Sequence, residues 1–298
     1  MGIDWRYGSI VIDDSWHIAN VSRGFKGGTM RDVERVEYGV RPVSDADEKD
    51  PLFVSAIARA MQVLSAFHGT SKPLTLNEIA KICGMGKSTV QRIVHTLRQQ
   101  GYIERDPNDR GYVPGVRILD HTLDYLRLNS VIVRALPSLL ELRRDASERV
   151  DLSVRDDLRL VYALRLQSKR EAFFATLIGN SVPLYCTSGG RAVMAQLSDD
   201  EVNEIIQRSN RRKFTPRTIT EPQEIWDKIH EARENGYALA SEEVLQGEIA
   251  IGAAIRGPEG RPVAAIHIGG SLSEWNRDNF VGHFAPLVLA AAGSINRF

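Results

Sequence analysis

The feature that most limits the fold of this chain is a pair of short helices, each with its own start signal, between residues 75 and 100. Thr75 is a candidate N-cap, and Glu78 follows three residues later, which is the spacing of a capping box. Gly84 is placed to end the first helix. Ser88 and Gln91 repeat the capping-box spacing after a turn at residues 84–87. Two short helices joined by a Gly-containing turn predict a helix-turn-helix.

The second of these helices has one apolar and one polar side. Val90, Val94 and Leu97 recur at helical spacing and are expected to face a core. The polar side carries groups of the kind that reach base edges and phosphates in a major groove. A solvated helix without a special role would show similar residues, but the position after a capped turn favours DNA reading. The candidate DNA contacts of this motif are Thr75, Lys87, Ser88, Thr89, Gln91, Arg92 and His95.

A hairpin is predicted directly after this helix, because two short β-prone runs flank a turn rich in Pro, Asn, Asp and Gly at residues 106–111. In this place a hairpin is the wing of a winged helix-turn-helix. Arg105 and Arg110 are candidate contacts to backbone phosphate or the minor groove. The alternative for each is a surface ion pair with Asp106 or Asp109.

Charge is unevenly distributed in a chain whose formal net charge is zero. Residues 53–114, which contain the helix-turn-helix and the hairpin, hold 8 basic and 4 acidic side chains. This local excess fits contact with phosphates, although a basic surface without a nucleic-acid partner would also show it.

The same region resembles the IclR family of bacterial transcription regulators, at residues 74–80, 86–92 and 101–106. The likeness continues towards the C-terminus and covers roughly residues 53–296. It implies a regulator that binds double-stranded operator DNA and a small-molecule effector, an organic or aromatic acid of a catabolic pathway. It also implies a homodimer or a tetramer built as a dimer of dimers. Activation or repression, the operator sequence and the identity of the effector stay open.

Four segments are expected: a flexible leader at 1–52, the winged helix-turn-helix domain at 53–114, a connecting helix at 115–128 and an effector-binding domain at 129–298. The leader shows no sustained hydrophobic period. Its first 29 residues match nothing in the family pattern and precede Met30, so we expect translation to start at Met30. The alternative is a genuine N-terminal arm.

The connecting helix carries two apolar stripes, one through Leu119 and Leu123 and the other through Ile118 and Tyr125. A helix that is apolar on two sides needs two partners. One partner is expected to be its own domain and the other a second subunit, which would make this helix a dimerisation element. The family resemblance implies the same role.

The C-terminal segment alternates helix, strands, helices, strands and helix, which predicts an antiparallel sheet covered by helices. Strands are expected at 152–155, 159–166, 172–178, 237–242, 248–256 and 261–269, and a final helix at 274–296. The predicted fold class is therefore α+β, with an N-terminal winged helix-turn-helix, a connecting helix and a C-terminal antiparallel sheet with helices. The resemblance implies that this last domain is GAF-like.

Three stretches of this domain, at 179–192, 242–253 and 264–270, resemble the effector pocket of the family. The hydroxyls and backbone N–H groups that open the helix after Thr187 could hold an anion. In the strand at 249–255 bulky and small residues alternate between the two faces, and periodicity does not say which face lines a pocket. Arg191 either attracts a carboxylate there or has a structural role. The candidate effector contacts are Gly179, Leu184, Thr187, Ser188, Gly189, Arg191, Glu242, Ile251, Ala253 and Ile266.

Several other classes of protein are not indicated. The two cysteines, Cys83 and Cys186, form neither a disulfide framework nor a CxxC metal site. No cofactor motif, metal site or catalytic residue is predicted; Cys186 with His267 or His283 as base is the enzymatic alternative, and it has no evident third orienting group. No apolar run is long enough to span a membrane, so a cytoplasmic protein without a membrane partner is expected. A stand-alone sensory module would leave the helix-turn-helix unused.

Overall fold

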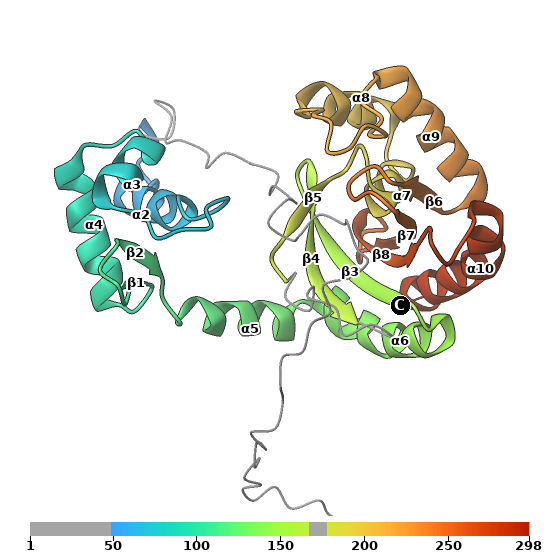
Figure 1. Ribbon diagram of the computed structural model, residues 1–298, viewed down its shortest axis with the longest axis horizontal. Coiled ribbons are helices and arrows are strands. Elements are labelled where there is room, and N and C mark those ends of the chain that lie inside the picture. Colours follow the sequence, from blue (N-terminus) through green and yellow to red (C-terminus); the bar gives the residue numbers. More distant parts are fainter. Residues whose placement is uncertain (1–48, 167–177, 298) are drawn as a thin grey trace, which may run out of the picture.

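The computed structural model describes residues 49–166 and 178–297, which form two units joined by one helix (Figure 1). Most of the expected leader and the strand expected at 172–178, except for its last residue, lie outside the described residues. The combination of a helix-turn-helix unit with an antiparallel sheet covered by helices confirms the predicted α+β class.

The N-terminal unit packs three helices against a two-stranded antiparallel hairpin. Its core consists of the apolar residues that recur at helical spacing, with Val63, Ile79, Val90 and Val94 almost fully buried. The hairpin follows the third helix directly, as the wing of this fold does. The described elements of this unit are α2 (Ser55–Ser65), α3 (Leu76–Cys83), α4 (Lys87–Gln99), β1 (Ile103–Arg105) and β2 (Tyr112–Pro114).

The two predicted helix starts have different outcomes. Thr75 is the N-cap of α3, and its side chain forms the expected capping box with Glu78. The capping box predicted at Ser88 is wrong, because Gly86 is the N-cap of α4 in an extended conformation, and Ser88 lies in the first helical turn. Gly84 ends α3 with a φ of 63°, a left-handed conformation that glycine adopts without strain.

The C-terminal unit is built on a six-stranded sheet, counted over the described residues, with the strand order β5-β4-β3-β8-β7-β6. Every neighbouring pair is antiparallel. The strands are β3 (Arg149–Asp156), β4 (Arg159–Leu166), β5 (Ser181–Pro183), β6 (Ala238–Ser241), β7 (Glu248–Arg256) and β8 (Pro262–Ser271). The four central strands are long, and the two edge strands β5 and β6 are short.

Helices cover the two faces of this sheet and create two separate apolar cores (Figure 1). One core lies between the sheet and the helices α6 (Ser130–Ala146) and α10 (Arg277–Asn296). The other lies between the opposite face and the helices α7 (Ser188–Met194), α8 (Asp199–Arg208) and α9 (Pro222–Asn235). Side chains alternate between the faces along each strand, so successive residues of β7 belong to different cores.

The connecting helix α5 (Ile118–Leu128) is held at both ends. On the N-terminal side, Tyr102 hydrogen-bonds His121, and the backbone N–H of Val116 donates to Glu104 at 3.2 Å. On the other side only Asn129 separates α5 from α6: its N–H donates to a carbonyl of α5, and its side chain accepts from the first N–H groups of α6. The same residue therefore ends one helix and begins the next.

Candidate functional site

The exposed side of α4 holds most of the residues predicted to read DNA. Ser88, Gln91, Arg92 and His95 line one shallow depression of the surface. Thr75, Lys87, Arg105 and Arg110 line a second one, and Leu76 and Tyr112 border both. The start of α3, the start of α4 and the wing thus form one continuous surface that carries polar and basic side chains. Thr89 is only half-exposed, and the Thr75 hydroxyl is already engaged with Glu78 in the cap.

Both wing arginines form the surface ion pairs that the sequence offered as the alternative. Arg105 Nε lies 2.5 Å from Asp109 Oδ1, and Arg110 Nε lies 3.0 Å from Asp106 Oδ2. Asp106 is buried and also accepts the backbone N–H groups of Asn108 and Arg110, so it organises the turn. The hydrogen bond from Arg110 lowers the pKa of Asp106, which keeps that carboxylate ionised. The side chains of Arg105 and Arg110 remain exposed, and both line the same depression as Lys87 of α4.

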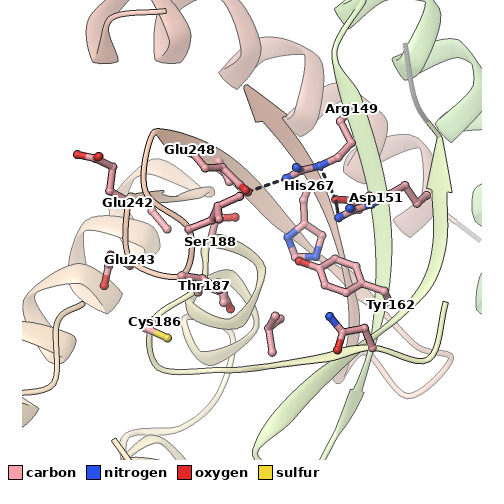
Figure 2. A pocket seen from close by; sticks show the side chains of 17 residues that line it. Arg149, Asp151, Tyr162, Cys186, Thr187, Ser188, Glu242, Glu243, Glu248 and His267 are labelled. Atoms are coloured by element: carbon pink, nitrogen blue, oxygen red, sulfur yellow. Dashed lines mark hydrogen bonds and ion pairs between the residues drawn. The ribbon is translucent and has the colours of Figure 1, made fainter. Parts of the chain in front are cut away.

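A cavity of about 110 Å³ lies in the C-terminal unit between the sheet, the N-terminal end of α7 and the loop that joins β6 to β7 (Figure 2). Of the predicted effector contacts, Thr187, Ser188 and Glu242 line it. The lining residues are Arg149, Asp151, Tyr162, Arg165, Asn180, Val182, Cys186, Thr187, Ser188, Ala240, Glu242, Glu243, Val244, Leu245, Glu248, Ala250 and His267.

The face of β7 that carries the small residues turns to the cavity. Its bulky face packs in the core against α6 and α10, so Ile251 and Ala253 do not line the cavity, and neither does Ile266 on β8. The small residues on the other face have two roles, since one leaves space for the cavity and another allows close packing. Ala250 leaves room for the cavity, whereas a Cβ on Gly252 would lie 2.8 Å from the backbone nitrogen of Gly189. Small residues therefore provide space at one position and close packing two residues later.

Arg191 has the structural role and does not point into the cavity. Its side chain is fully buried and forms a two-point ion pair with Glu243, with Nη1–Oε1 at 2.5 Å and Nη2–Oε2 at 2.8 Å. Its Nε donates to the carbonyl of Tyr185. The interpretation of Arg191 as a carboxylate-attracting group is therefore wrong in this structure, since both of its terminal nitrogens already bind Glu243.

The other predicted contacts lie beside the cavity. Leu184 is a core residue, and Gly179 occupies a turn next to the lining residue Asn180. Gly189 lies under the ring of His267, where any Cβ would come within 2.0 Å of the imidazole. The hydroxyl of Thr187 is used within the protein, because it accepts the N–H of Gly190 and donates to the carbonyl of Pro183.

One wall of the cavity is a network of charged side chains that the sequence analysis missed (Figure 2). Asp151 accepts both Nε and Nη2 of Arg165, at 2.7 and 3.0 Å, and Nε of Arg149 at 3.0 Å. Arg149 also donates to Glu248 at 2.6 Å. The signal in the sequence was the alternation along β3, where the polar residues Arg149, Asp151 and Ser153 are interleaved with apolar ones and fall on one face of the strand.

His267 completes this wall as a neutral imidazole. Its Nε2 lies 2.6 Å from the hydroxyl of Ser153. Burial lowers the pKa of His267 to about 4, so the ring carries no charge at neutral pH. Burial also raises the pKa of the Cys186 thiol well above its usual range, which leaves it protonated and unreactive. These two side chains therefore do not resemble an activated nucleophile and its base.

The described part of the chain lacks two other features, a membrane-spanning helix and a metal site. Within residues 49–166 and 178–297, none of the helices combines the length and apolar character needed to cross a membrane. The same residues contain no group of His, Cys, Asp and Glu side chains arranged to hold a metal ion.

These features define a class of protein in which a winged helix-turn-helix is joined by a helix to a domain that holds a cavity with one charged wall. The family model of the IclR helix-turn-helix domain matches residues 56–107, and the model described as "Bacterial transcriptional regulator IclR C-terminal" matches residues 123–297. The chain belongs to the IclR family of transcription regulators.

Known proteins of this family are similar over most of their length. The HTH-type transcriptional regulator XynR of Escherichia coli is 28% identical over 72% of this chain and 85% of its own. The regulator Rv1719 of Mycobacterium tuberculosis is 30% identical over 68% of this chain and 78% of its own. The crystal structure of an IclR family transcriptional regulator from Brucella abortus superposes with a TM-score of 0.71 at 26% identity, covering 90% of this chain and 98% of that one.

Proposed function

We propose that this protein is a sequence-specific DNA-binding transcription regulator whose affinity for its operator changes when a small organic molecule occupies the cavity of the C-terminal unit. The observation that carries the proposal is the continuous surface of α4, the start of α3 and the wing, which carries polar and basic side chains. In this fold the second helix of the helix-turn-helix lies in the major groove, and the wing reaches the flanking backbone.

The proposed function also requires a second subunit, and the exposed apolar residues of α5 favour one. No residue of α5 is buried, and Leu119 and Leu123 are each 64% exposed. The outer side of α2 adds Val54, Ile57 and Met61, which are also exposed. We propose that these faces pair with their copies in a homodimer, so that two α4 helices reach successive major grooves of one duplex.

Under this proposal the protein acts on DNA in the cytoplasm and catalyses no reaction. The cavity then only binds the effector. Occupation of the cavity favours one arrangement of the two DNA-binding units over another, and the operator affinity changes by the difference in ligand affinity between the arrangements. The domain limits 53–114 and 129–298 correspond in this scheme to the reader and the sensor.

The DNA-binding role is tested by Gln91→Ala and Arg92→Ala in the full-length protein. Each variant should weaken binding to a duplex selected from a random pool by about 1–3 kcal/mol if its side chain reads a base, while the thermal melting curve stays unchanged. Gln207→Ala, on the exposed side of α8, is the matched control. Wild-type affinity in both α4 variants would exclude this helix as the reader.

A further inference from the structure

The cavity presents hydrogen-bonding groups of both kinds side by side. Arg149 and Glu248 meet at its wall through Nη2 and Oε1. A guanidinium has five N–H donors and a carboxylate has two acceptor oxygens, so both groups keep capacity for a further partner. Asn180 also lines the cavity, and its buried Oδ1 has no hydrogen-bond partner among the residues that the structure describes. A buried acceptor without a partner is unfavourable unless a ligand or water supplies a donor.

The charges around the cavity are already balanced within the protein. Each of the four lining carboxylates has an arginine partner: Asp151 binds Arg149 and Arg165, Glu248 binds Arg149, Glu243 binds Arg191, and Glu242 binds Arg217. His267 adds no charge at neutral pH. Among the described lining residues there is thus no cation that lacks a counter-charge.

A carboxylate ligand would fit this wall poorly. It would bring acceptor atoms only, and although Arg149 keeps N–H donors for them, its negative charge would lie beside Asp151 and Glu248, which already balance the arginines of this wall. Like charges brought together in a site of low dielectric constant repel strongly. A hydroxyl group, in contrast, donates once and accepts twice, and neighbouring hydroxyls match an arginine and a glutamate that lie side by side.

The remaining walls set the size and shape of the ligand. Ala240, Ala250, Val182, Val244 and Leu245 form apolar surfaces around the polar wall. The volume of about 110 Å³ is somewhat smaller than that of an engineered cavity of roughly 150 Å³ that holds benzene. The enclosed part of a ligand therefore has about six non-hydrogen atoms or fewer, with carbon atoms against the apolar walls.

We infer that the effector is an uncharged, polyhydroxylated small molecule, such as a short polyol or sugar, held by Arg149, Glu248 and Asn180. This inference rests on the proposed function, since it assigns the ligand class of the same cavity. It departs from the organic or aromatic acid that the sequence led us to expect.

The test is calorimetry on the full-length protein at neutral pH with matched ligands. Glycerol, erythritol and xylitol are compared with glycerate, erythronate and xylonate, and benzoate represents the aromatic acids. At least one polyol should bind at least about tenfold more tightly than the acid of the same carbon number. The inference would be overturned if any acid bound more tightly than every polyol, or if no polyol bound at all. An acid that binds and changes operator affinity would leave the proposed regulator intact.

Glu248→Gln tests the charge argument itself. The variant keeps the size of the side chain but leaves Arg149 with less counter-charge, so polyol affinity should fall and the affinity for the matched acid should rise by about tenfold. Glu204→Gln, which removes a surface carboxylate paired with Arg208 on α8, should change neither. If Glu248→Gln weakened both ligand classes and lowered the melting temperature, Glu248 would be a structural residue only and the assignment would be wrong.

Discussion

Arg191 and Arg149 differ in how many hydrogen-bond donors of their guanidinium groups remain available for a ligand. Arg191 is fully buried and uses Nε and both terminal nitrogens on Tyr185 and Glu243. Arg149 is a quarter exposed and shares its donors between Asp151 and Glu248 at the cavity wall. The sequence shows both as arginines near polar residues. Only the three-dimensional partners separate a structural ion pair from a group that can meet a ligand.

Arg191→Met should strongly destabilise the protein, because it leaves the carboxylate of Glu243 buried without its counter-charge. We expect a loss of about 3–5 kcal/mol in the free energy of unfolding, measured by urea denaturation. Adding Glu243→Leu should recover part of this loss, since the unpaired charge disappears with it. A double variant that is less stable than Arg191→Met would contradict this account.

The stability of the protein should depend on pH through His267. Its pKa is about 4 in the folded chain and near 6.5 when exposed, so below pH 6.5 the unfolded chain takes up a proton that the folded chain refuses. The stability present above pH 6.5 is therefore lost progressively as the pH falls to 4, by about 3 kcal/mol. Urea unfolding between pH 7 and pH 4 should show a smaller decrease for His267→Gln than for the wild type. Equal decreases would show that other groups dominate.

Elements were predicted from the sequence more securely than the directions in which their residues face. The alternation of β7 was evident, and the limits of 248–256 match the structure. Which face met the cavity depended on contacts with Gly189 and α10, which are distant in the sequence. For the same reason the helix-turn-helix and the wing could be predicted from local signals, whereas the charged wall required three separate strands to be brought together.

Thr75 and Ser88, the two residues predicted to begin helices, provide a comparison at the scale of one element. Thr75→Ala should destabilise the N-terminal unit by about 1 kcal/mol, because Thr75 accepts the N–H of Glu78 and caps α3. Ser88→Ala should leave stability almost unchanged, since Gly86 is the N-cap of α4 and Ser88 lies exposed within the helix. Thermal melting of both variants decides the matter. A comparable loss in Ser88→Ala would mean that its hydroxyl does cap the helix.

The whole molecule has an apolar surface that the described residues of one chain leave uncovered. Its residues lie on α5, the helix that joins the two units (Figure 1), and on the outer side of α2. The sequence indicated that α5 needs two partners. In the structure Leu126 packs against the core of the C-terminal unit, whereas Leu119, Leu123, Tyr125 and Leu128 are exposed. The sequence of one chain contains no direct record of the second subunit, so the pairing itself stays a prediction.

Leu119→Glu combined with Leu123→Glu should convert the protein to monomers, because two charges would have to be buried in the proposed interface. Analytical ultracentrifugation should show the change in mass, and operator affinity should fall because one α4 helix reads only half of a two-fold site. Leu52→Glu, on an exposed residue before α2, is a control for added charge. An unchanged dimer in the double variant would place the interface elsewhere.

Because a single residue separates α5 from α6, insertions into α5 would change the position of the DNA-binding unit in a defined way. Asn129 ties the end of one helix to the start of the next, so the DNA-binding unit holds a fixed angular phase relative to the sheet. One residue inserted into α5 would rotate that unit by about 100° and advance it by about 1.5 Å. Seven inserted residues, nearly two full turns, would restore its direction and move it about 10 Å outwards. Only insertions near a whole number of turns would keep both recognition helices facing one side of the duplex, so the reach of the regulator along DNA changes in steps set by the helical repeat.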